Sequence, residues 1–205
     1  MLPQDRLGER LARCIFGLAL FGVGVAVLIA SDLGASPWDV FHTGVSDLTG
    51  MPVGTVLIVT GVALLFMWIP LGERVGLGTI LNAVEIGVVV GLVLPHLPDD
   101  APIGVQLTMM LAGVVLIALG SGFYIGAGLG PGPRDGLMTG LARRGWSLRL
   151  TRTGIEITAL VVGVALGGAI GIGTAVFAIG IGPLVQLFLP RLTVQPAEYL
   201  ASDVA

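Results

Sequence analysis

The stretch LGASPWDVFHTG, Leu33 to Gly44, returns 96 positions later as LGPGPRDGLMTG, Leu129 to Gly140. Both copies have Leu, Gly, Pro, Asp, Thr and Gly at the same six places. Glycine tolerates the left-handed conformation that ends a helix, and proline suits the first turn of the next helix, where no amide hydrogen is needed. Each stretch therefore predicts a break followed by a fresh helix of roughly 10–12 residues, about 16–18 Å long.

A helix of that length covers about half of a bilayer's hydrocarbon core. Irregular backbone at membrane depth is tolerated only where it is buried in protein or lines a water-filled cavity. Two interpretations follow. Either the two breaks are re-entrant and meet near the midplane, or each short helix lies flat at a membrane surface, where Pro and Asp simply cap it.

The composition places the chain in a membrane. Of the 205 residues, 55% are hydrophobic and 11% are charged, and the mean hydropathy is +0.99, which a water-soluble domain of this size cannot accommodate. Apolar runs of about 20 residues predict spanning helices, and they are too long and too continuous for barrel strands. The six predicted spans are 12–30, 53–70, 75–95, 104–128, 149–168 and 170–190.

A second repeated block shows that the duplication covers most of the chain. GLGTILNAVEIGVVVGLVLPHL (76–97) aligns with GIGTAVFAIGIGPLVQLFLPRL (171–192). The predicted fold class is therefore an all-α membrane protein with six transmembrane helices, arranged as two inverted three-helix repeats, each with a short broken or re-entrant helix after its first span. The units are 12–97 and 104–192, flanked by a cytoplasmic N-terminus (1–11) and a cytoplasmic C-terminal tail (193–205).

The positive charges agree with an inverted second unit. The chain has no lysine, and its ten arginines fall in or beside the segments that this topology puts in the cytoplasm. Cytoplasmic loops carry the Lys/Arg excess in membrane proteins, so we expect the bacterial cytoplasmic (inner) membrane, with both termini inside. An eight-span alternative would put Arg74 and Arg191 outside.

The first copy, DLGASPWDVFHTGVSDLTGMPVGT, closely resembles the signature of the bacterial YczE-type membrane proteins, relatives of the YitT-type group. The resemblance extends over about 12–192 and implies a multi-span bacterial inner-membrane protein, but it implies no activity. The second copy departs from the pattern, with Arg134 in the place of Trp38. The matching residues are Gly34, Ser36, Pro37, Trp38, Asp39, Gly54 and Thr55.

Polar residues inside the spans are costly and need a reason. Glu85 and Asn82 lie three residues apart on one helix face. Glu85 is expected to be a neutral carboxyl group that either couples transport to protons or hydrogen-bonds a neighbouring helix. Glu156 is expected to pair with Arg152 one turn away. His42 either titrates near neutral pH or is an exposed surface histidine.

These features favour a transporter of a small solute or ion, because inverted-repeat carriers bind their substrate where discontinuous helices meet. The alternative is a non-transporting regulatory or assembly subunit of another membrane complex. We expect no enzyme activity, cofactor or nucleic-acid partner, since no metal, phosphate-loop or triad motif is present; membrane lipids are expected partners, and a homodimer is left open. The expected substrate-binding residues are Gly34, Ser36, Pro37, Trp38, Asp39, Gly130, Gly132, Pro133, Arg134 and Asp135; Glu85 and Asn82 are the expected proton-coupling residues.

Overall fold

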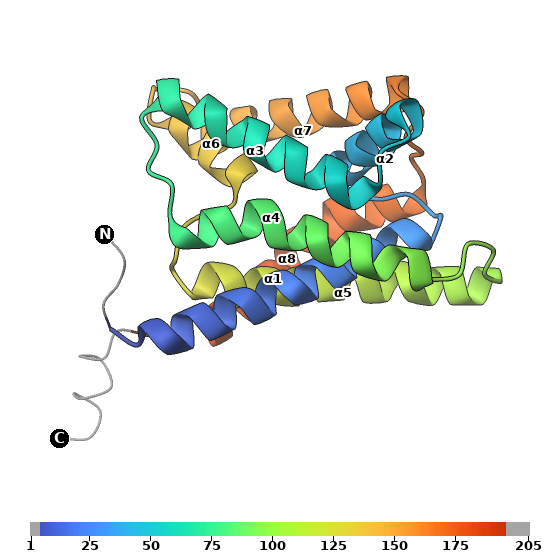
Figure 1. Cartoon of the computed structure of the whole chain (residues 1–205), viewed down its shortest axis with the longest axis horizontal. Coiled ribbons are helices and arrows are strands. Elements are labelled where there is room, and N and C mark those ends of the chain that lie inside the picture. Colours follow the sequence, from blue (N-terminus) through green and yellow to red (C-terminus); the bar gives the residue numbers. More distant parts are fainter. Residues whose placement is uncertain (1–4, 196–205) are drawn as a thin grey trace.

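The computed structural model describes residues 5–195, and this part of the chain is helical with no strands. Its helices follow the order long, short, long, long twice (Figure 1). They are α1 (Leu7–Ala30), α2 (Pro37–Thr49), α3 (Val53–Leu71), α4 (Leu77–Val93) with the 3₁₀ turn η1 (Leu94–His96), α5 (Ile103–Gly126), α6 (Pro133–Ala142), α7 (Leu148–Ala165) and α8 (Ile172–Leu192). The predicted all-α class is confirmed.

Five helices are long and apolar enough to cross a membrane: α1, α3, α4 with η1, α5 and α8. The predicted sixth span, α7, is not among them. Its 18 residues include Arg149, Arg152 and Glu156. Five of the six predicted spans are therefore supported, and the crossing of α7 stays a prediction.

The long helices run roughly along one common direction, and α2 and α6 lie toward opposite ends of the molecule (Figure 1). The two ends of the described chain lie together. The amide of Val194 donates to the Gly126 carbonyl at 2.9 Å, and Arg13 donates to the Leu192 carbonyl at 3.1 Å. Helix α1 already begins at Leu7, inside the segment expected to be an N-terminal tail, and most of the predicted C-terminal tail (196–205) lies outside the described residues.

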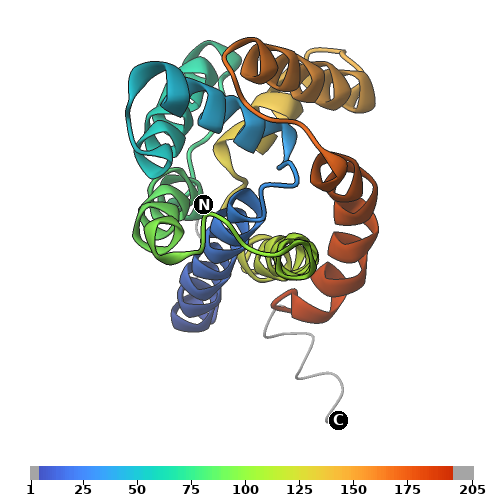
Figure 2. The same cartoon turned by 90° about the vertical axis from the view of Figure 1, so that its right-hand side faces the viewer.

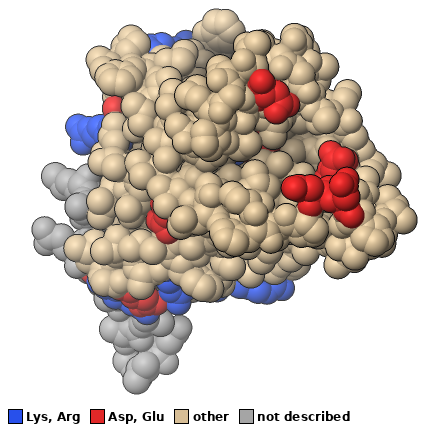
Figure 3. Space-filling model, turned by 45° about the vertical axis from the view of Figure 1, so that its right-hand side comes forward, with Lys and Arg blue, Asp and Glu red and all other residues tan. Residues whose placement is uncertain are grey.

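On one face of the molecule, charged side chains lie mainly toward the edges (Figure 3). On the face in Figure 3, uncharged side chains cover a broad central area, most blue arginines lie at the left and lower edges, and the largest red groups lie on the right. A wide uncharged surface between charged ends is typical of a protein that crosses a bilayer.

The two halves meet where α1 crosses α5. A Cβ added to Gly17 would lie 2.8 Å from the Gly120 carbonyl oxygen, and one added to Gly24 would lie 2.9 Å from that of Gly113. Small residues let helices approach this closely in lipid. Gly113 corresponds to Gly17 and Gly120 corresponds to Gly24, each 96 positions later. Exchanging the two halves therefore turns the first contact into the second.

A second pair of contacts links each break to the other half. The carbonyl of Leu33 accepts a hydrogen bond from the Gly173 amide at 2.7 Å, and the carbonyl of Leu129 accepts one from the Gly78 amide at 2.9 Å. Both amides belong to the first turn of a last helix, α8 or α4. This explains why the Gly-x-Gly-Thr block is repeated together with the break.

The last two helices of each half differ. Helices α3 and α4 pack along each other, whereas α7 and α8, their counterparts, do not (Figure 2).

Candidate functional site

Helix α2 begins as its sequence predicts. Ser36 is the N-cap; its hydroxyl oxygen accepts from the Asp39 amide at 3.2 Å and donates to the Asp39 carboxylate at 2.5 Å, and Pro37 occupies the first helical position. Asp39 is only 4% exposed. The first break therefore places a serine and an aspartate, mutually hydrogen-bonded, inside the protein.

Helix α6 begins with different chemistry. Its N-cap, Gly132, has no side chain to cap the helix. The first turn is bound from outside: the indole N–H of Trp68 on α3 donates to the Pro133 carbonyl at 2.8 Å. Trp68 is 1% exposed, and its ring lies against Gly136, where a Cβ would collide with it. Trp68 thus fixes the start of α6 from the other half of the chain.

Trp38 and Arg134, which hold equivalent positions in the two copies, come close together inside the protein. Both line the same two cavities, together with Phe21 of α1. The guanidinium of Arg134 lies 5.6 Å from the centre of the Phe21 ring. Among the described residues, Arg134 has no ion pair or hydrogen bond. Its neighbour Asp135 accepts from the Tyr124 hydroxyl at 3.1 Å.

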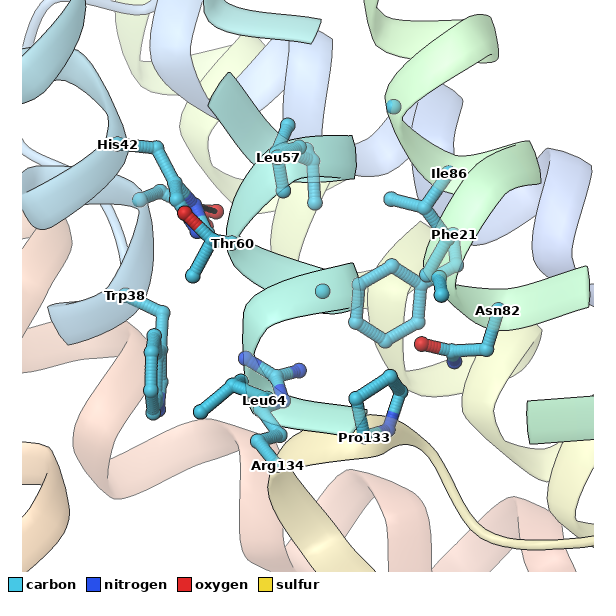
Figure 4. A pocket seen from close by; sticks show the side chains of 15 residues that line it. Phe21, Trp38, His42, Leu57, Thr60, Leu64, Asn82, Ile86, Pro133 and Arg134 are labelled. Atoms are coloured by element: carbon cyan, nitrogen blue, oxygen red, sulfur yellow. Dashed lines mark ion pairs between the residues drawn. The ribbon is translucent and has the colours of Figure 1, made fainter. Parts of the chain in front are cut away.

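The first cavity, of about 60 Å³, lies between α2, α3, α4 and α6. Figure 4 shows Trp38 and His42 on one side, Asn82 and Phe21 on the other, and Arg134 reaching between them. Asp39 and Thr60 also line it. Its polar groups come from both halves of the chain.

The second cavity, of about 260 Å³, adjoins the same Trp38 and Arg134 and extends between α7 and α8. Its polar lining includes Ser36, Tyr124 and Asp135. Arg152 and Glu156 of α7 also line it; they form the predicted ion pair, with 3.0 Å between Nε and Oε1.

The structure thus brings together most of the residues expected to bind substrate. Ser36, Pro37, Trp38 and Asp39 come from the first break, and Pro133, Arg134 and Asp135 come from the second. Asp39 and Asp135 do not share a cavity; each lines one of two adjoining cavities. Whether any of these residues binds a substrate stays a prediction.

The other residues that were expected at the site have different positions or roles. Gly34 and Gly130 adopt φ of +95° and +125°, which only glycine takes readily, and they shape the loops rather than line these two cavities. Gly132 packs beside Asn82. Of the two expected proton-coupling residues, Asn82 lines the first cavity, whereas Glu85 lines neither cavity.

His42 is not the exposed surface histidine that was one of the two expectations. It is 5% exposed, and its Nδ1 lies 3.6 Å from the Asp39 carboxylate, too far for a hydrogen bond. The local sequence predicts helix α2, but it does not predict which residues surround His42. His42 lines the first cavity together with Leu57 and Thr60 of α3.

Comparison with known proteins places this architecture in a family. The DUF6198 family, described as a family of unknown function, matches residues 8–190. The chain belongs to this family. The chain is also similar to the uncharacterized membrane protein YczE of Bacillus subtilis, 37% identical over 85% of this chain and 83% of that protein, which confirms the YczE-type resemblance.

Two further relatives have similar coverage. An uncharacterized protein of Haemophilus influenzae is 35% identical over 85% of this chain and 81% of its own length. The uncharacterized protein YyaS of Bacillus subtilis is 29% identical over 85% of this chain and 89% of its own length. No solved structure matches the chain. The family and the membrane character are therefore shown, and the activity has to be argued from the cavities.

Proposed function

We propose that this protein transports a small solute or ion across the bacterial cytoplasmic membrane, with its binding site between the N-terminal ends of α2 and α6. The observation that carries the proposal is the position of Trp38 and Arg134. These equivalent residues of the two breaks line the same two cavities. Helix breaks are tolerated at membrane depth where they line such cavities.

The proposal includes a six-span inverted repeat, with α7 as the sixth span and both termini in the cytoplasm. The exchanged contacts support it: Gly17 with Gly120 and Gly24 with Gly113. The hydrogen bond from α8 to Leu33 and the one from α4 to Leu129 are likewise exchanged when the halves are exchanged. Contacts that recur with the halves exchanged are expected when two similar units are related by a two-fold axis in the membrane plane.

Such an arrangement suits alternating access. In transporters of this kind one repeat rocks against the other around a fixed site at their interface. Here the cavities lie at that interface, and each break is held by one backbone hydrogen bond to the opposite half. Movement of one half would carry the other half's break with it.

The test is solute release by the purified protein alone. Liposomes containing the protein are filled with a metabolite extract of bacterial cells, and the solutes that leave are identified by mass spectrometry against empty liposomes. We expect faster release of at least one solute. A matched variant, Trp38→Ala with Arg134→Ala, should abolish that release while inserting normally.

If no solute leaves faster than from empty liposomes, transport is contradicted. Consistent co-purification of a second membrane protein would then favour a regulatory or assembly subunit.

A further inference from the structure

Arg134 is a charged side chain on the cavity walls whose donors are not used by the described protein. The other charged groups there have partners. Asp39 accepts from Ser36, Asp135 accepts from Tyr124, and Arg152 pairs with Glu156. The guanidinium has five N–H donors, and its contact with the face of Phe21 uses none of them.

A second unused donor lies close by. The indole nitrogen of Trp38 is buried without a hydrogen-bond acceptor. Buried polar groups in proteins are almost always hydrogen-bonded, and an arginine inside a membrane protein generally has a partner. Because the Trp38 nitrogen has almost no accessible surface, the unpaired donors that a ligand can reach are those of Arg134, which call for hydrogen-bond acceptors that carry a negative charge.

The second cavity also has an apolar side, and its origin can be read in the sequence. Helices α3 and α4 approach closely because Gly54 faces Gly87; a Cβ on Gly87 would lie 2.5 Å from the Gly54 carbonyl oxygen. In the second half, Arg149 has the place in α7 that Gly54 has in α3, the second helical residue, and it is exposed; Gly182, the counterpart of Gly87, has nothing within 4 Å of an added Cβ. Because the glycine pair is lost, α7 and α8 do not pack together.

The second cavity occupies this opening. On α8 it is lined by the apolar side chains of Phe177, Ile181 and Val185, on α6 by Arg134, and on α7 by the Arg152–Glu156 ion pair. Its volume of about 260 Å³ far exceeds the roughly 10–15 Å³ that one ordered water needs. An occupant would meet the unpaired guanidinium of Arg134 on α6 and the apolar side chains of α8.

We propose that the second cavity binds an amphipathic organic anion, with its carboxylate or phosphate at Arg134 and its apolar body against Phe177, Ile181 and Val185 of α8. This deepens the proposed function by naming the class of substrate, and it rests on that function, although binding is measurable without transport. Arginine suits the headgroup because its planar fork matches two oxygens of a carboxylate or phosphate.

The test measures binding of radiolabelled decanoate and decyl phosphate to the full chain in nanodiscs of zwitterionic lipid, with empty nanodiscs as the blank. The variant is Arg134→Gln, and the matched control is Arg149→Gln, an exposed arginine that does not line the cavity. We expect at least one probe to bind saturably, with about ten-fold weaker binding to Arg134→Gln and unchanged binding to Arg149→Gln. The probe that binds more tightly identifies the headgroup.

A comparison with the uncharged analogue, methyl decanoate, distinguishes recognition of the anion from nonspecific hydrophobic binding. It should bind weakly and equally to the wild type and to Arg134→Gln. Gly182→Leu, placed in open space, gives an independent variant: it should fold and weaken decanoate binding by filling the cavity. Equal binding of acid and ester to the wild type, or unchanged decanoate binding to Arg134→Gln, would overturn the proposal.

The two proposals can fail separately. Arg134-dependent binding without any solute release would leave the anion site standing and contradict transport. Release of only neutral or cationic solutes, with no binding of either probe, would leave transport standing and overturn the anion site.

Discussion

The carbonyl of Leu33 accepts a hydrogen bond from the amide of Gly173 at 2.7 Å, joining the break of the first half to the last helix of the second. A side chain on Gly173 has no room there, because its Cβ would press on the backbone of Leu33 and Gly34. Gly173→Ala is therefore expected to destabilise the fold by about 1–3 kcal/mol. Thermal unfolding followed with a thiol-reactive dye checks this, since Cys14 is fully buried and reacts only on opening.

The matched control lies on the same helix. A Cβ on Gly180 meets only Val114, at 3.9 Å, so Gly180→Ala should leave the unfolding temperature unchanged or raise it through higher helix propensity. Equal stability of Gly173→Ala and Gly180→Ala would show that the contact between the halves contributes little.

Trp68 should matter for the placement of α6. Trp68→Phe removes the 2.8 Å hydrogen bond to Pro133 and part of the packing on Gly136, and we expect a loss of about 1–3 kcal/mol in stability with slower solute release. Trp146, which is 66% exposed, supplies the control: Trp146→Phe should change neither. Unaltered release by a folded Trp68→Phe protein would mean that α6 does not depend on Trp68.

The sequence predicts those features of the fold and the site that are determined by residues close together in the chain. The starts of α2 and α6 follow from Pro37 and Pro133 after their glycines, signals that act within a few residues. Trp68 carried no such signal, because its partner lies 65 positions away. The covering of His42 and the opening between α7 and α8 likewise depend on other helices.

The sequence alone shows that the two halves differ at particular positions, but it does not show the structural consequence of those differences. Glu85 aligns with Gly180, and Trp38 aligns with Arg134. The alignment indicates that the halves differ, but only the packing of Phe21 against Arg134 and the separation of α7 from α8 show where the difference leads.

The aspartates should be unequal. Asp39 is 4% exposed and close to His42, whereas Asp135 is only half-buried. Asparagine also caps helices well, so Asp39→Asn is expected to change stability by at most about 1 kcal/mol and yet to impair solute release more than Asp135→Asn does. Full release by a folded Asp39→Asn protein would reduce Asp39 to a capping residue.

Glu85 remains a candidate for proton coupling. It has no hydrogen-bond or ion-pair partner among the described residues, which leaves its carboxyl group free to exchange a proton. Glu85→Gln keeps the size and hydrogen bonding but cannot release a proton, so it should abolish solute movement driven by a proton gradient and spare exchange of the solute across the membrane. If gradient-driven movement persists in Glu85→Gln liposomes, the residue has a structural role.

The central claim, that the cavities between the two breaks open to each side of the membrane in turn, is tested most directly by labelling a cysteine there. Ser121 lines the second cavity, and its hydroxyl bonds only within its own helix, to Ile117 at 2.7 Å. Ser121→Cys in a Cys14→Ala background should therefore fold normally. In vesicles of one orientation, a membrane-impermeant thiol reagent should label Cys at 121 when added to either face, and a transported solute should slow both reactions. Labelling from one face only, or from neither, would contradict alternating access.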